Sequence, residues 1–155
     1  MDKITIKRVK HEISLIDEMI IASTPLLEIA KLREPDYSEK CGIAYNIHSF
    51  YYGIEKILLL ILIEEDKLTI DEAKWHKAVL SKAFEKTVNR DPILNENLID
   101  ILKDYLHFRH VSRNSYGSIL VWDKMKHLAI NLKSTWEMVK SDLMVFMEKY
   151  SKEDL

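Results

Sequence analysis

The segment from Phe108 to Gly117 contains the side chains of this chain that are best suited to chemistry. It places an imidazole, His110, between two guanidinium groups, Arg109 and Arg113. A guanidinium presents several N–H donors in a fixed fork that matches phosphate oxygens. Residues four positions apart share one face of a helix, so Arg109 and Arg113 can act together. The segment therefore predicts a local cationic cluster, made of these three residues, that can contact phosphate groups.

Asn114 and Tyr116 complete the segment with an amide and a phenol. Cleavage of RNA without a metal requires removal of the ribose 2′-hydroxyl proton, stabilisation of a negatively charged phosphorane and protonation of the leaving 5′-oxygen. Arg109 suits the second task. The other two need a group that titrates near neutrality, most often an imidazole. The amide of Asn114 neither takes nor gives a proton.

This pattern resembles the signature of the HEPN-domain ribonucleases of the HepT-like toxin family. In that signature an Arg is followed, after four intervening residues, by a His, one further residue and a Tyr. Arg109 and Tyr116 occupy their positions, whereas Asn114 stands at the position of the His. Further likeness to the family's helices is found in Ser49–Leu59, Trp75–Leu80 and Ile119–Trp122.

The resemblance implies a metal-independent RNA endonuclease that is the toxin of a toxin–antitoxin system. Without its acid–base residue such an enzyme loses roughly 10²–10⁴-fold in rate, so the chain as written is expected to be impaired. Three explanations of Asn114 stay open. The protein has naturally lost catalysis and kept binding, the residue was introduced to inactivate a toxic protein, or His110 or His107 has taken over the role.

The resemblance also implies partners. It implies a homodimer in which two copies of the motif meet in one cleft, with Arg109, Asn114 and Tyr116 facing the subunit seam. It further implies a minimal nucleotidyltransferase as antitoxin, which transfers AMP to Tyr116; the added phosphates would occupy the site of Arg109 and Arg113 and exclude RNA. The alternatives are an inactive dimerisation module that docks the nucleotidyltransferase, and an unrelated helical adaptor. For Tyr116 itself the alternative is a residue that only packs against the last helix.

The composition is that of an ordinary globular protein. The chain has 155 residues, 47% of them hydrophobic and 31% charged, and a net charge of −2. This weakly acidic balance excludes a broad basic surface for coating nucleic acid, so contact with RNA must be local. The single cysteine, Cys41, excludes an internal disulfide, and the six histidines show no metal-ligand spacing, so neither metal nor cofactor is expected. No signal peptide or membrane-spanning run is recognised, which predicts a cytoplasmic protein.

The hydrophobic periodicity predicts the helices that must position the motif. Apolar residues recur at helical spacing over residues 4–32 and 38–65, in a third segment that ends at about residue 86, in a fourth that starts near Asn95 and carries the Arg109 motif, and over residues 124–150. With only three glycines and three prolines, the chain is predicted to form an all-α, single up-and-down bundle of about four to five helices. We expect a HEPN-like bundle over residues 1–150 and a frayed tail over 151–155.

Local signals refine this outline. Pro25 is expected to bend or split the first helix, and a turn at residues 34–37 to end before Ser38 or a neighbour opens the second. Thr69 with Glu72 resembles a capping box for the third helix. Further expected features are Asn95 and Asp123 as caps of the fourth and fifth helices, Gly117 as a helix terminator, and His76 as a partly buried helix residue.

Overall fold

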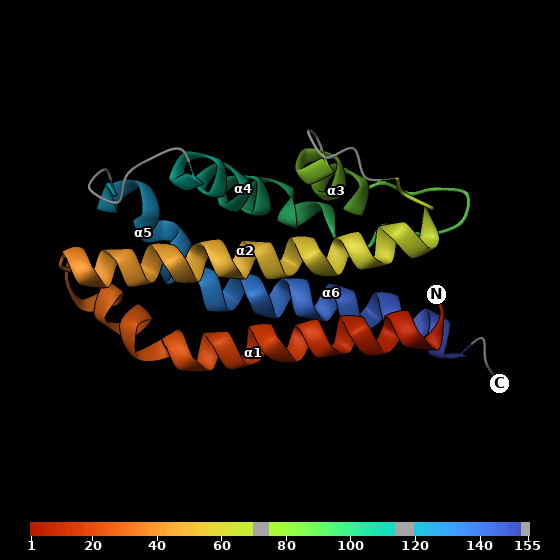
Figure 1. Cartoon of the computed structure of the whole chain (residues 1–155), viewed down its shortest axis with the longest axis horizontal. Coiled ribbons are helices and arrows are strands. Elements are labelled where there is room, and N and C mark those ends of the chain that lie inside the picture. The colour runs from red at the N-terminus through yellow and green to blue at the C-terminus, as the bar shows by residue number, and fades with distance from the viewer. Residues whose placement is uncertain (70–74, 114–119, 153–155) are drawn as a thin grey trace.

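The computed structural model describes residues 1–69, 75–113 and 120–152, and these ranges fold into helices and their connections (Figure 1). Six α-helices and one short 3-10 helix are present in them, slightly more than the sequence predicts, and the all-α fold is confirmed. In chain order they are α1 (Lys3–Leu32), α2 (Tyr37–Glu65), α3 (Trp75–Ala83), η1 (Glu96–Leu98), α4 (Ile99–Arg113), α5 (Trp122–Ile130) and α6 (Leu132–Lys152).

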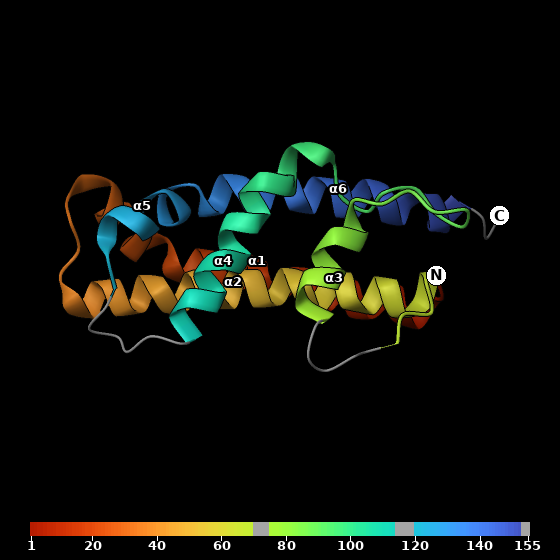
Figure 2. The ribbon, with the colours of Figure 1, turned by 90° about the horizontal axis from the view of Figure 1, so that it is seen from above.

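The bundle is arranged around α2. Helices α1, α2 and α6 run roughly along the long axis of the molecule, whereas α3 and α4 lie against the opposite side of α2 from α1 (Figure 1). Figure 2 shows that α3 and α4 cross α2 obliquely, next to one another. Because α2 is covered from several sides, its buried positions fall all round the helix, from Ile43 to Leu62.

The apolar character of α2 follows from this central place. By length and composition α2 is the one described helix that could cross a membrane, a test that the core helix of a soluble protein also passes. Half of its most apolar window is buried inside the bundle. At its N-terminus Asp36 accepts a hydrogen bond from the Glu39 amide, and the Glu39 side chain accepts one from the Asp36 amide, a capping box. The cap is thus the neighbour Asp36 and not Ser38.

Helix α1 is continuous through Pro25. The ribbon bends in its C-terminal part without splitting (Figure 1). Just before the proline, the hydroxyl groups of Ser23 and Thr24 both donate to the Ile20 carbonyl oxygen, a type of bond that accompanies helix bending. Toward the middle of α1, Asp17 accepts hydrogen bonds from Trp136 Nε1 (2.7 Å) and Lys140 Nζ (2.6 Å), which joins α1 to α6.

The predicted single helix over residues 124–150 is wrong, because the structure has α5 and α6 with a break at Asn131. The Asn131 side chain and its own backbone N–H both donate to the His127 carbonyl oxygen. Asn side chains compete in this way with helical hydrogen bonding. The predicted Asp123 cap is also wrong: the N-cap of α5 is Val121, without a side-chain hydrogen bond, and Asp123 lies in the first turn.

Other boundaries follow the sequence more closely. Asn95 is the N-cap of η1, which continues into α4. Helix α3 ends at Ala83, earlier than residue 86, and α6 continues to Lys152, past the predicted boundary at residue 150. The Thr69–Glu72 capping box and the Gly117 terminator involve segments outside the described residues. Between α3 and η1, Arg90 anchors the chain to the end of α2 by pairing with Asp66 through two hydrogen bonds of 2.7 Å.

Candidate functional site

Arg109 lies in the last part of α4 and points into the bundle toward α2. Its Nη1 atom donates to Oε1 of Glu55 at 2.8 Å and to Oε2 at 3.1 Å. Arg109 is only 8% exposed and Glu55 only 1%. The Arg of the predicted motif is therefore held in a buried ion pair rather than displayed on the surface.

Glu55 is a charge placed in the most apolar stretch of the chain. Its neighbours Ile54, Ile57 and Leu58 are buried, so an unpaired carboxylate here would be very unfavourable. The guanidinium of Arg109 compensates that charge, and the two groups depend on each other in the low-dielectric interior. This dependence fixes the place where α4 crosses α2.

His76 adds an imidazole to the pair. It stands in the first turn of α3, and its Nδ1 atom lies 2.8 Å from Glu55 Oε1 and 2.6 Å from Arg109 Nη1. The side chain is 26% exposed, as expected for a partly buried helix residue. The Trp75 ring stacks on the imidazole with centroids 3.8 Å apart. Helices α2, α3 and α4 thus meet at one polar cluster, Glu55–His76–Arg109.

The short distances among His76 Nδ1, Glu55 Oε1 and Arg109 Nη1 restrict the hydrogen bonding of the imidazole. An Nδ1 atom that carries a proton can donate to Glu55 but opposes the N–H donor of Arg109. An Nδ1 atom without a proton can accept from Arg109 but opposes the carboxylate oxygen. Both contacts of Nδ1 cannot be satisfied at once, so the choice of the ring nitrogen that carries the proton and the position of Arg109 are coupled.

Tyr51 lies one turn before Glu55 on the same face of α2 and is 1% exposed. Burial and, after it, the negative charge of Glu55 raise the pKa of the Tyr51 phenol well above its ordinary value, while Arg109 offsets part of that effect. Tyr51 therefore stays a neutral hydroxyl group throughout the neutral pH range. It closes the apolar side of the cluster without adding a charge.

The hydrogen bonding of Arg109 is incomplete. Its Nε atom is the one buried side-chain N or O atom in the described part of the chain that has no partner. Arg90, which is equally buried, uses Nε, Nη1 and Nη2 on Asp66 and on the carbonyl oxygens of Lys82, Glu85 and Asp91. An unpaired buried N–H costs about 1–3 kcal/mol, so the comparison distinguishes a purely structural arginine from one with binding capacity left.

The other predicted site residues lie partly outside the described structure. His110 is exposed on α4, and so is His107. Arg113 ends α4, but its side chain lies outside the described part of the structure, as do Asn114 and Tyr116. Of the predicted cluster of Arg109, His110 and Arg113, the structure thus places the first in the interior and the second on the surface.

Sequence reasoning missed Glu55 as the partner of Arg109 and treated His76 only as a packing residue. A signal for Glu55 was present, since it is an isolated acidic residue within the apolar run of α2 and such a charge requires a partner. The identity of that partner follows only from the crossing of α2 and α4. Among the described residues no group of three or more His, Cys, Asp or Glu side chains is placed to hold a metal ion.

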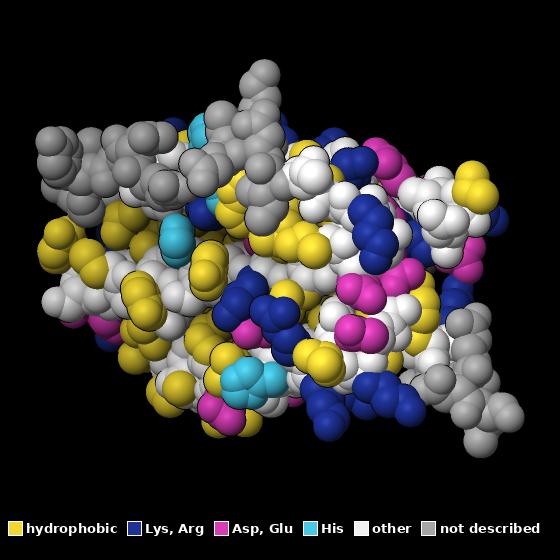
Figure 3. Space-filling view, turned by 45° about the vertical axis from the view of Figure 1, so that its right-hand side comes forward, with side chains coloured by type: hydrophobic (Ala, Val, Ile, Leu, Met, Phe, Trp, Pro, Cys, Tyr) yellow, Lys and Arg dark blue, Asp and Glu magenta, His cyan; other side chains and the backbone are white. Residues whose placement is uncertain are grey.

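The face of the molecule drawn in Figure 3 is mixed in character. Figure 3 shows apolar, basic and acidic side chains interspersed on one face, without a broad basic field. This distribution agrees with the net charge of −2. Electrostatic recognition by this protein must therefore be local.

Comparison with known proteins adds one finding. Neither the curated proteins nor the solved structures gave a match to the chain. A family model described as HepT-like protein matches residues 42–150, which is well over half of the chain and includes Glu55, His76 and Arg109. The chain therefore belongs to the HepT-like protein family.

Proposed function

We propose that this protein is a HEPN-type toxin of a toxin–antitoxin system, with the scaffold of a metal-independent RNA endonuclease that is impaired by Asn114. The observation that carries the proposal is the state of Arg109. This residue of the family motif is held in place by Glu55 but keeps an unpartnered N–H group. A guanidinium of this kind suits the phosphorane, because its donors match phosphate oxygens and gain strength away from bulk water.

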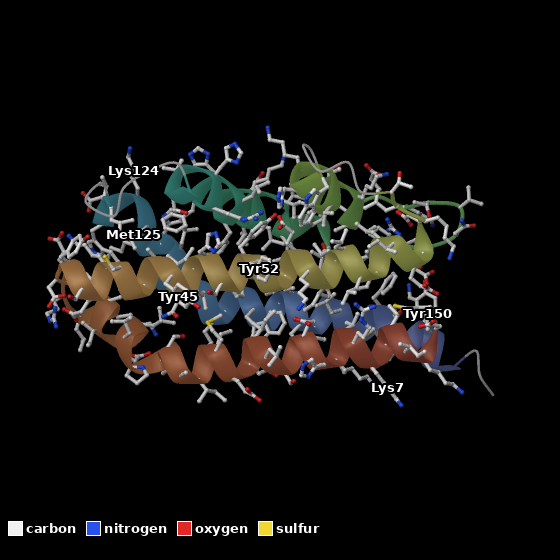
Figure 4. All side chains as sticks on the ribbon, in the orientation of Figure 1. Lys7, Tyr45, Tyr52, Lys124, Met125 and Tyr150 are labelled. Atoms are coloured by element: carbon white, nitrogen blue, oxygen red, sulfur yellow. The ribbon has the colours of Figure 1, made fainter. Side chains whose placement is uncertain are left out.

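A homodimer is part of the proposal. Tyr45, Tyr52 and Ile63 lie at helical spacing along α2 and are 71%, 50% and 40% exposed. Figure 4 shows the two tyrosines on the length of α2, the helix that also carries Glu55. Exposed apolar side chains aligned on one helix face support an interaction surface, and a two-fold axis would bring the same face of two chains together.

Regulation by a minimal nucleotidyltransferase completes the proposal. Transfer of AMP to Tyr116 would add phosphate groups a few residues beyond Arg109, and these would compete with RNA for the guanidinium. The modified site would then be blocked by phosphate groups of the kind that it binds. This regulation would take place in the cytoplasm, where the toxin and antitoxin are made.

A second candidate function is a binding module that dimerises and docks the nucleotidyltransferase without cleaving RNA. Two observations favour it. Asn114 stands where the family's signature has an acid–base residue, and Arg109 is committed to Glu55 in the free chain. The two candidates differ in whether RNA is cleaved.

RNA binding by the Arg109→Lys variant tests whether Arg109 contacts the RNA. Lysine keeps a positive charge opposite Glu55 but loses the fork, so the affinity for a fluorescent single-stranded RNA, measured by anisotropy at low salt, should fall by about tenfold. Arg90→Lys is the matched control, since Arg90 is equally buried and should leave RNA affinity unchanged. Equal affinities of wild type and folded Arg109→Lys protein would refute the role of Arg109.

Cleavage by Asn114→His separates the two candidates. Restoring the imidazole should raise the rate of RNA cleavage by roughly 10²–10⁴-fold if the scaffold is that of a nuclease. A variant that binds RNA as wild type does and still fails to cleave it would favour the binding module.

A further inference from the structure

His76 is the imidazole that the structure places at the motif arginine. Its Nδ1 atom is 2.6 Å from Arg109 Nη1 and 2.8 Å from the buried carboxylate of Glu55. The hydrogen bonds of the ring pass through Nδ1, and no residue in the described part of the chain occupies Nε2. The side chain is 26% exposed, enough for the ring edge to reach a ligand.

A buried carboxylate beside an imidazole fixes which ring nitrogen acts. When Nδ1–H donates to Glu55, the lone pair of Nε2 is free to accept a proton, and the carboxylate stabilises the imidazolium that results. By comparison, His127 lies 3.7 Å from Asp104, and both side chains are more than half exposed. Of these two pairs only His76–Glu55 has the distance and the burial of an oriented acid–base pair.

Arg109 links the hydrogen bonding of the His76–Glu55 pair to the binding of substrate. In the free chain Arg109 Nη1 competes with His76 for the same carboxylate oxygen. A phosphate that draws the guanidinium toward itself would leave Glu55 Oε1 to Nδ1–H. Binding of the RNA backbone and orientation of the imidazole would then be one linked event.

We propose that His76 is the proton-transfer residue of this site, with Glu55 as its positioning residue, in place of the imidazole missing at Asn114. The inference rests on the proposed function and deepens it. His76 Nε2 takes the proton of the ribose 2′-hydroxyl, and the 2′-oxygen forms a bond to phosphorus. The bond from phosphorus to the 5′-oxygen breaks, water protonates that oxygen, and the imidazolium returns its proton to the hydroxide that remains. The products are a 2′,3′-cyclic phosphate and a 5′-hydroxyl.

The test uses the full chain and a fluorescent single-stranded RNA, with a fully 2′-O-methylated copy as an uncleavable probe of binding. Wild type should cleave slowly, and His76→Gln should lower that rate by roughly 10²–10⁴-fold while affinity for the methylated RNA stays unchanged. His127→Gln, which removes the exposed His–carboxylate pair, should cleave as wild type does. Circular dichroism verifies folding, and His76→Asn replaces His76→Gln if the latter is unfolded.

The pH–rate profile separates a chemical role from a structural one. The charged groups described against the ring are Glu55 of α2 and Arg109 of α4. Tyr51 of α2 lies near both of these groups. The wild-type rate should depend on pH, and that dependence should disappear in His76→Gln. Glu55→Gln removes the carboxylate that orients the ring, so it should lower the cleavage rate while affinity for the methylated RNA stays unchanged.

Equal cleavage by wild type and His76→Gln overturns the inference. No cleavage by wild type overturns it as well, and Asn114→His then separates the levels of the proposal. If that variant cleaves, the nuclease function stands and only the role of His76 falls. If neither protein cleaves or binds RNA, the proposed function falls with it.

Discussion

Arg90 and Arg109 are both buried arginines, and the difference between them lies in their partners. Arg90 is 5% exposed and bonds with all three nitrogen positions of its guanidinium. Arg109 is 8% exposed, and its Nε has no partner among the described residues. Burial alone therefore does not describe the two arginines, because their hydrogen-bond inventories differ.

A double-mutant cycle measures how strongly Arg109 and Glu55 depend on each other. Arg109→Met should lower the free energy of unfolding by about 3–5 kcal/mol, because the Glu55 carboxylate is left buried without a counter-charge. Adding Glu55→Leu should recover most of that loss. Urea denaturation measures both values.

The control for this cycle is Arg33→Met, which removes a surface partner of Glu39 and should change stability little. If the Arg109→Met and Glu55→Leu effects simply added, the ion pair would not be coupled as the structure indicates.

The sequence identifies Arg109 as a candidate site residue, but it does not predict which side chains surround it. The periodicity of α4 showed that Arg109 is a helix residue in a polar segment. It did not show that Arg109 faces inward, since that depends on Glu55, more than fifty positions earlier in the chain, and on the angle at which two helices cross. His76 required a third helix, α3, to complete the cluster.

At the scale of the secondary-structure element, the boundary of a helix can depend on one side chain. Asp36 caps α2, whereas the sequence pattern pointed to Ser38 or a neighbour, and Ser38 lies in the first turn of the helix. Asp36→Ala should lower the free energy of unfolding by about 1 kcal/mol, because the Glu39 amide loses its acceptor. Ser38→Ala should change it by less than about 0.5 kcal/mol. Thermal or urea unfolding compares the two variants, and a larger effect of Ser38→Ala would place the cap at Ser38.

The long helices were predictable, and the break at Asn131 was not. Residues Met125, Leu128, Leu132 and Trp136 keep a helical spacing across the break, so their periodicity indicates one helix. At the break the Asn131 side chain donates to the His127 carbonyl oxygen, a local competition with helical hydrogen bonding that hydrophobic patterning does not detect.

At the scale of the whole bundle, Asp17 joins two of the long helices, α1 and α6. Burial by itself raises the pKa of the Asp17 carboxyl group, but hydrogen bonds from Lys140 and Trp136 outweigh it and hold the pKa below its ordinary value of 3.8. A pKa lowered by folding stabilises the protein above that ordinary value. The contribution is lost as the pH falls from about 4 through the lowered pKa.

Asp17→Asn should therefore destabilise the protein most at neutral pH, by about 1 kcal/mol. Near pH 3 the wild-type carboxylate gains protons, so the difference between the two proteins should shrink. Urea midpoints at both pH values measure it. A constant difference would show that the charge of Asp17 does not contribute.

The central place of α2 also has a consequence for biosynthesis. α2 leaves the ribosome before α3, α4 and α5, the helices that cover its other faces, have been made. Of the described helices that contact it, only α1 has been made at that stage, so the apolar flanks that α3, α4 and α5 later cover are exposed. These flanks stay uncovered until α3, α4 and α5 have been made, and until then this segment is a natural client for chaperones that bind exposed hydrophobic helices.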